Sequence, residues 1–111
     1  MVVASAALLG GCAVLETRGA VAGCQAADAA TTLHAVSLGA REANPIVRWL
    51  LENTGAEGFV AAKVAVTLLV LHVYPEISSN VVILVNGITC GVAAHNARLA
   101  AELKREAQAS E

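Results

Sequence analysis

Apolar residues concentrate in three windows of the chain, at residues 20–40, 58–74 and 77–97. Each window approaches the roughly 20 residues that a helix needs to cross a bilayer. The second is the clearest, because Lys63 is its only Lys, Arg, Asp or Glu and Pro75 closes it. Its length favours a helix over a strand. The pattern predicts three membrane-crossing helices.

The first window is the least apolar of the three. Its polar residues include Gln25, Asp28, Thr31, Thr32 and His34. Hydropathy alone is therefore also compatible with a helix that lies in water. We keep both interpretations, a membrane helix with a polar face and a soluble helix.

A short helix is predicted between the first two windows. Asn44 followed by Pro45 is typical of an N-cap and a first helical position, and residues 53–55 form a stop signal. The segment 46–52 is amphipathic and carries Trp49, which suits a membrane interface. The predicted fold is all-α, a small helical membrane bundle of about three transmembrane helices plus a short interfacial helix.

The chain divides into three parts in this interpretation. Residues 1–19 form a signal-like leader, residues 20–97 the helical membrane domain, and residues 98–111 a polar tail. The leader ends in a Leu-Gly-Gly-Cys sequence that resembles a bacterial lipobox, which would make Cys12 a lipidation site. No Lys or Arg precedes this cysteine. An uncleaved apolar leader and an ordinary signal peptide therefore remain alternatives.

Composition supports a membrane environment. Hydrophobic residues make up 57% of the chain and charged residues 14%, against about a quarter charged in ordinary soluble domains. The formal net charge is −2 and the basic residues form no run. Nucleic-acid binding needs a basic surface, so we expect no nucleic-acid partner.

The cysteines and histidines form no recognisable site. The three cysteines are odd in number and include no C-x-x-C pair, which argues against a disulfide scaffold. The histidines are widely spaced, without the pattern of a metal-binding helix. These residues are Cys12, Cys24, Cys90, His34, His72 and His95. We predict neither a metal nor a cofactor, and no catalytic residue.

The basic residues predict the orientation. Five of the seven follow the first and third windows, at Arg41, Arg48, Arg98, Lys104 and Arg105, and none lies in the turn at 75–80. Arg18, before the first window, is the one that favours the opposite orientation. Basic segments stay on the cytoplasmic side. The sequence therefore predicts a bacterial plasma-membrane protein with its N-terminus outside and its C-terminus in the cytoplasm.

Polar residues recur on one face of each predicted helix and together predict a polar seam through the bundle. The seam residues are Asp28, Thr31, Thr32, Glu42, Asn44, Lys63, Asn86 and Asn96. Counting residues from the helix ends places Asp28 level with Asn86 and Lys63 roughly 10 Å deeper, near Glu42. In a structural role, Asp28 is protonated or bonds Thr32 and Asn86, while Lys63 extends its ammonium to the membrane interface or pairs with Glu42. In a functional role, Asp28 exchanges protons or Lys63 binds an anionic headgroup or solute.

These residues also carry a family resemblance. The sequence reads D-x-x-T-T from Asp28, G-x-x-E-x-N-P from Gly39, then Lys63 inside an apolar helix and Asn86 in a later one. This pattern is similar to a family of small bacterial and archaeal membrane proteins known as a domain of unknown function. The resemblance covers about residues 28–96 and implies a helical membrane domain without an assigned activity.

The leading functional hypothesis is a noncatalytic accessory or assembly protein. Its partners would be membrane lipid and either a second copy of the chain or another membrane protein. Transport of an ion, proton or small solute by an oligomer is the alternative, and Asp28 and Glu42 would then face an open cavity rather than a packed seam. An intramembrane enzyme and a membrane-anchored periplasmic lipoprotein are further alternatives. The calculated depth difference between Asp28 and Lys63 argues against catalysis by that pair.

Overall fold

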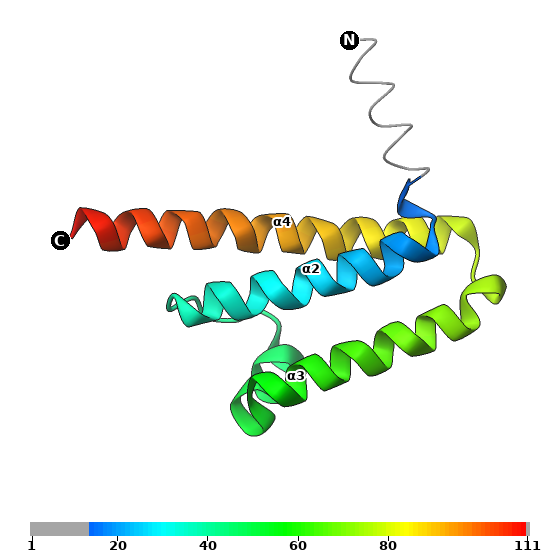
Figure 1. The fold of residues 1–111 in the computed structure, drawn as a ribbon, viewed down its shortest axis with the longest axis horizontal. Coiled ribbons are helices and arrows are strands. Elements are labelled where there is room, and N and C mark those ends of the chain that lie inside the picture. Colours follow the sequence, from blue (N-terminus) through cyan, green and yellow to red (C-terminus); the bar gives the residue numbers. More distant parts are fainter. Residues whose placement is uncertain (1–13, 111) are drawn as a thin grey trace, which may run out of the picture.

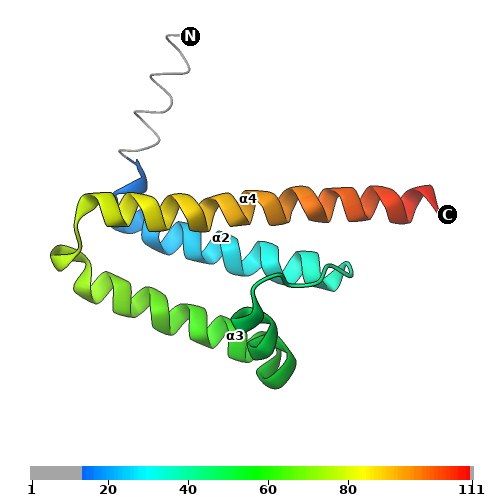
Figure 2. The ribbon, with the colours of Figure 1, turned by 180° about the vertical axis from the view of Figure 1, so that it is seen from behind.

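The computed structural model describes residues 14–110, and within this part all regular structure is helical. Three long helices, α2 (Arg18–Ser37), α3 (Pro45–Val73) and α4 (Ser79–Ala109), are joined by a loop and by the 3-10 turn η1 (Tyr74–Glu76). Helix α2 lies between the other two and packs against both (Figure 1). The reverse view shows α3 and α4 joined at one end and diverging toward the other (Figure 2). The all-α prediction is confirmed.

Side-chain caps fix where the helices begin. The Asn44 side-chain oxygen accepts hydrogen bonds from the backbone N–H groups of Ile46 (3.0 Å) and Val47 (3.4 Å), with Pro45 at the first helical position. This is the helix start that the sequence predicts. Thr17 and Ser78 cap α2 and α4 in the same way.

Helix α3 contains a break at Gly55. This residue has φ 72° and ψ −173°, a conformation that is essentially restricted to glycine. The break separates the segment with Trp49, which is 60% exposed, from the apolar segment that follows. The predicted stop at residues 53–55 therefore corresponds to a change in helix direction (Figure 1). The interfacial position of this short segment stays a prediction.

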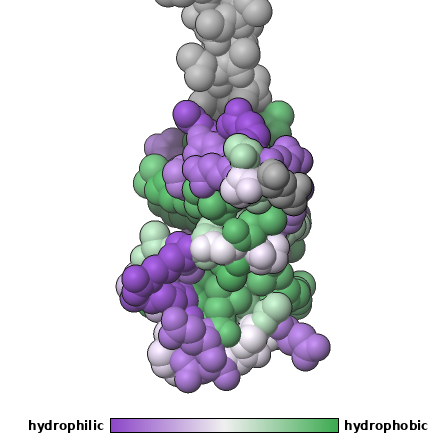
Figure 3. Space-filling view, turned by 90° about the vertical axis from the view of Figure 1, so that its left-hand side faces the viewer, coloured by the Kyte–Doolittle hydropathy of each residue, from purple (hydrophilic) through white to green (hydrophobic). Residues whose placement is uncertain are grey.

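Two helical segments are long and apolar enough to cross a membrane: α3 with η1 (Pro45–Glu76), and α4. Their most apolar windows are only 6% and 17% buried within the protein. Helix α2 is not among them, because its polar residues lower its hydropathy. Viewed from the end where α4 terminates, hydrophilic side chains gather above and below a hydrophobic band (Figure 3). The fold thus has three long helices, of which two are suited to a membrane by length and composition.

A disulfide joins α2 to α4 through Cys24 and Cys90, whose Cα atoms are 4.8 Å apart. The expectation that the odd cysteine count argues against such a bond was wrong. An odd number excludes complete pairing but still allows one bridge. The two residues are 66 positions apart, and the packing of α2 on α4 is what brings them together.

Aromatic and cationic side chains also hold the start of α2 in place. The Arg18 guanidinium lies 4.9 Å from the centre of the Tyr74 ring, and the Tyr74 hydroxyl donates to the backbone carbonyl of Glu16. These contacts connect the start of α2 to the end of α3. Both neighbouring helices are therefore linked to α2 near its first turns.

Candidate functional site

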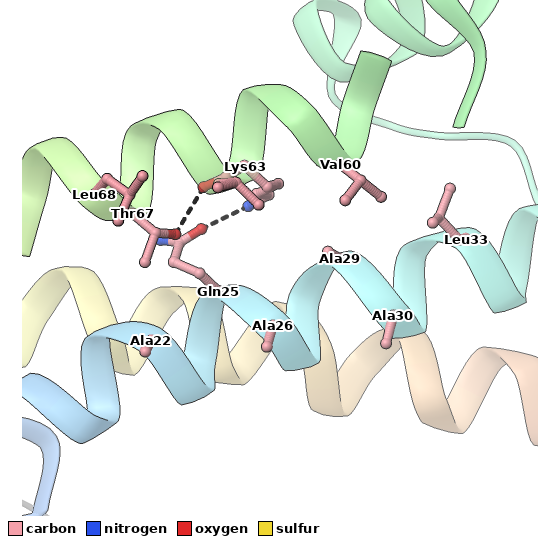
Figure 4. Close-up of a pocket in the computed structure, with 11 residues that line it drawn as sticks. Ala22, Gln25, Ala26, Ala29, Ala30, Leu33, Val60, Lys63, Thr67 and Leu68 are labelled. Carbon is pink, nitrogen blue, oxygen red and sulfur yellow. Dashed lines mark hydrogen bonds between the residues drawn. The ribbon is translucent and has the colours of Figure 1, made fainter. Parts of the chain in front are cut away.

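An ion pair between Asp28 of α2 and Lys63 of α3 forms the centre of the polar region. The Lys63 ammonium also donates to the Gln25 side-chain oxygen at 2.8 Å (Figure 4). The two paired side chains are only 12% and 22% exposed. Gln25 lies three residues before Asp28 and therefore on the same face of α2. That spacing was the sequence signal for Gln25, which the predicted seam omitted.

The predicted depth difference between Asp28 and Lys63 was wrong. Asp28 lies nine residues before the end of α2, about 14 Å, and Lys63 lies eight residues after Gly55, about 12 Å. Measured from the same end of the bundle, the two residues are nearly level. The estimate failed because it assumed that every helix fills the full membrane thickness, and because it ignored the reach of the flexible lysine stem.

A second polar link joins α2 to α4. The Asn96 amide donates to the hydroxyl of Thr32 at 3.0 Å and approaches that of Thr31 at 3.5 Å. Thr31 donates its own proton to the backbone carbonyl of Ala27 at 2.7 Å. The polar faces of α2 and α4 are therefore in direct contact at this level.

Asn86 lies away from this region. Its amide donates to the backbone carbonyl of Leu15 at 2.7 Å, and the residue is 2% exposed. Leu15 precedes α2, so α4 extends beyond the start of α2 at this end. The expected bond between Asp28 and Asn86 was wrong, because α2 and α4 are offset along their axes.

A polar cavity of about 380 Å³ opens between the three helices and the α2–α3 loop. Six predicted seam residues line it: Asp28, Thr32, Glu42, Asn44, Lys63 and Asn96. Arg41, which the seam prediction omitted, also lines it. Glu42 accepts a hydrogen bond from the backbone N–H of Asn44 at 3.0 Å, and the expected pairing of Glu42 with Lys63 was wrong.

A groove of about 410 Å³ lies on the opposite side of the contact between α2 and α3. Alanines of α2 form one wall, and apolar residues of α3 such as Val60 and Leu68 form the other (Figure 4). Lys63 lines both this groove and the polar cavity. Its ammonium group therefore lies where an apolar and a polar space meet.

The histidines take no part in this cavity. His34, His72 and His95 are exposed, and residues 14–110 contain no group of three side chains that would hold a metal ion. Cys12, the predicted lipidation site, lies outside the described residues. The chemistry that the cavity offers is therefore that of carboxylates, an ammonium, a guanidinium, amides and hydroxyls.

Comparison with known proteins identifies a family but no activity. Neither the curated proteins nor the solved structures contain a match to the chain. One family model matches residues 19–99, which include all the cavity residues and both cysteines of the disulfide. Since this match covers most of the 111 residues, the chain belongs to the family described as a domain of unknown function, DUF5658.

Proposed function

We propose that the protein is a noncatalytic integral membrane protein in which α2, the second segment of α3, and α4 all cross the bilayer. The observation that carries this proposal is the exposure of apolar side chains on α3 and α4. Val64, Leu68, Leu84 and Ile88 are each at least half exposed. Exposed apolar surface is unfavourable in water by about 25 cal/mol per Å², whereas lipid solvates it.

In this proposal helix α2 crosses the membrane with its polar side chains shielded from lipid by α3 and α4. A charged side chain at the centre of a bilayer costs about 2.5–3.5 kcal/mol, so a polar helix needs partners there. Lys63 of α3 supplies the counter-charge for Asp28, and Asn96 of α4 bonds Thr32. These contacts support the third span, which hydropathy alone does not identify.

The orientation that we propose has the start of α2 outside and the end of α4 in the cytoplasm of a bacterium. Basic residues of the α2–α3 loop and of α4 favour the cytoplasm at that end. The Cys24–Cys90 disulfide supports the same direction. Disulfides persist in oxidising compartments such as the space outside the plasma membrane. Cys24 lies six residues after the start of α2, about 9 Å from that end, so the bridge is near the end that we place outside.

An accessory or assembly role fits the internal pairing of the charged groups. The carboxylate of Asp28 and the ammonium of Lys63 are bonded to each other, so neither is placed as an independent acid or base. The predicted depth difference no longer argues against catalysis by these two residues. The proposal of a noncatalytic role therefore rests on their ion pair. Lipidation at Cys12 remains a separate prediction.

Binding or transport of a small solute is the second candidate function. The observation that favours it is that Asp28 and Glu42 line an open cavity instead of a closed seam. A single copy encloses little volume, so transport would require several copies of the chain.

Cysteine accessibility in intact cells tests the topology. In a Cys12→Ser background, single cysteines replace the exposed residues Glu16, Glu52, Asn80 and Glu106. We expect a membrane-impermeant maleimide to label positions 16 and 80 in intact cells, and positions 52 and 106 only after permeabilisation. The parent without added cysteines is the control, because its other cysteines form the disulfide. Labelling of all four positions from outside would contradict the proposal.

A further inference from the structure

We infer that the polar cavity binds a small zwitterionic group, in which a primary ammonium and an anionic group are joined by a short linker. The inference deepens the second candidate function above and rests on it. Four charged side chains line the cavity, the carboxylates of Asp28 and Glu42 and the cationic groups of Lys63 and Arg41. Their formal charges cancel.

The balance of charge selects against a simple ion. Because the charges of the lining side chains already cancel, a bound cation or anion would leave one charge uncompensated. A zwitterion adds no net charge. Its ammonium matches the carboxylates, and its anionic group matches the ammonium and guanidinium groups.

The cavity side chains also keep hydrogen-bonding capacity for a ligand. One carboxylate oxygen of Asp28 is taken by Lys63, and one of Glu42 by the Asn44 backbone, so each acid retains a second oxygen. The Lys63 ammonium has three donors, of which Asp28 and Gln25 use two. Within residues 14–110 Arg41 takes part in no ion pair.

The shape of the cavity allows two sources for such a group. A volume of about 380 Å³ lies at the small end of ligand pockets. Its apolar wall includes Ile88 and Val92 of α4, which are 60% and 44% exposed on the outer surface of the bundle. An acyl chain attached to the group can extend outward along these two exposed side chains. The group is therefore either a free solute or the headgroup of a lipid. Glycerophosphoethanolamine and the headgroup of phosphatidylethanolamine both join an ammonium to a phosphodiester with one negative charge, so neither carries a net charge.

Binding to the purified full chain tests the inference. Glycerophosphoethanolamine is titrated in detergent while the thermal midpoint is followed, with inorganic phosphate and ethylamine as probes that carry charge of one sign only. Native mass spectrometry of protein from nanodiscs of equal phosphatidylethanolamine and phosphatidylglycerol measures lipid retention. We expect a rise in the midpoint with glycerophosphoethanolamine alone if the source is a solute. Selective retention of phosphatidylethanolamine would identify the lipid.

Two variants connect the binding to this cavity. Glu42→Gln and Arg41→Gln each remove one charge from the loop and leave the Asp28–Lys63 pair intact. Each is expected to weaken binding about tenfold or more, as loss of a charge-assisted hydrogen bond does. Arg48→Gln is the matched control, because this basic residue follows the same loop but does not line the cavity. We expect its binding to match that of the parent.

Three outcomes would overturn the inference. These are equal binding of phosphate or ethylamine, equal loss in the Arg48→Gln control, and no binding of either the solute or the lipid. The accessibility experiment reports separately on the membrane proposal. A correct topology with no zwitterion binding would refute only the cavity assignment, whereas the detergent titration still tests the cavity if the topology is wrong.

Discussion

At the scale of single residues, the Asp28–Lys63 pair is the main electrostatic feature of the bundle. Both groups are withdrawn from solvent, and each provides the counter-charge of the other. Taking two charges out of water carries a large desolvation cost, which mutual attraction and further hydrogen bonds offset. Gln25 provides one such bond to Lys63. The pair is therefore more important as a unit than either residue alone.

Removing one member of the pair is expected to destabilise the protein more than removing both. Lys63→Met or Asp28→Asn leaves a polar or charged group without its partner, at a cost of about 3–5 kcal/mol. The double variant should lose less stability than either single variant, measured by thermal unfolding in detergent. Arg98→Gln and Glu102→Gln are matched controls, because that pair is exposed and contributes about 0.3–0.5 kcal/mol. Additive losses at Asp28 and Lys63 would show that the pair does not act as a unit.

At the scale of elements, α2 is the helix on which the other two assemble. It contacts α3 through the ion pair and α4 through the disulfide and the Thr32–Asn96 bond. Small residues such as Ala35 and Ala93 are buried, and they allow close approach of helices. The covalent link fixes how far α4 is offset along α2.

Breaking the disulfide is expected to lower stability substantially. The bridge closes a loop of 66 positions, for which chain entropy predicts a contribution of about 4 kcal/mol. Cys24→Ser, Cys90→Ser and the double variant should therefore show the same lowered thermal midpoint, and reducing agent should lower the parent to that value. Cys12→Ser serves as the control and should leave the midpoint unchanged. Detection of free thiols at both Cys24 and Cys90 in the oxidised protein would refute the bridge.

At the scale of the whole molecule, the apolar surface on α3 and α4 is too large for the protein to bury internally. The windows suited to a membrane are 6% and 17% buried, so most of their side chains face outward. In the view onto the end where α4 terminates, hydrophilic side chains lie above and below a hydrophobic band (Figure 3). The outward-facing apolar windows are what we expect for the membrane bundle proposed above.

A charge on the apolar side of α3 is expected to impair membrane insertion. Val66 is half exposed and lies near the middle of the segment after Gly55. Val66→Arg should disfavour insertion by about 2.5–3.5 kcal/mol. The measurement is the fraction retained in the membrane pellet after alkaline extraction. Gln108→Arg in the exposed end of α4 is the control and should behave like the parent; equal retention of both variants would contradict the proposed membrane face.

Local sequence signals predicted the elements of this fold well. The second window was expected at residues 58–74 and the helix ends at Val73; the third was expected from residue 77 and α4 starts at Ser79. Asn44 with Pro45 predicted a helix start, and the stop signal at Gly55 marks the break. These features depend on residues close together in the chain, and so the sequence contains them directly.

The sequence by itself determined the helical class, the apolar segments, and six of the residues that line the cavity, since hydrophobic periodicity and capping are local properties. Only the tertiary structure decided that Asp28 meets Lys63, that Cys24 meets Cys90, and that Asn86 lies apart from both. The physical reason is that the offset between packed helices depends on how side chains of all three fit together. Residue counting along one helix contains no information about that offset.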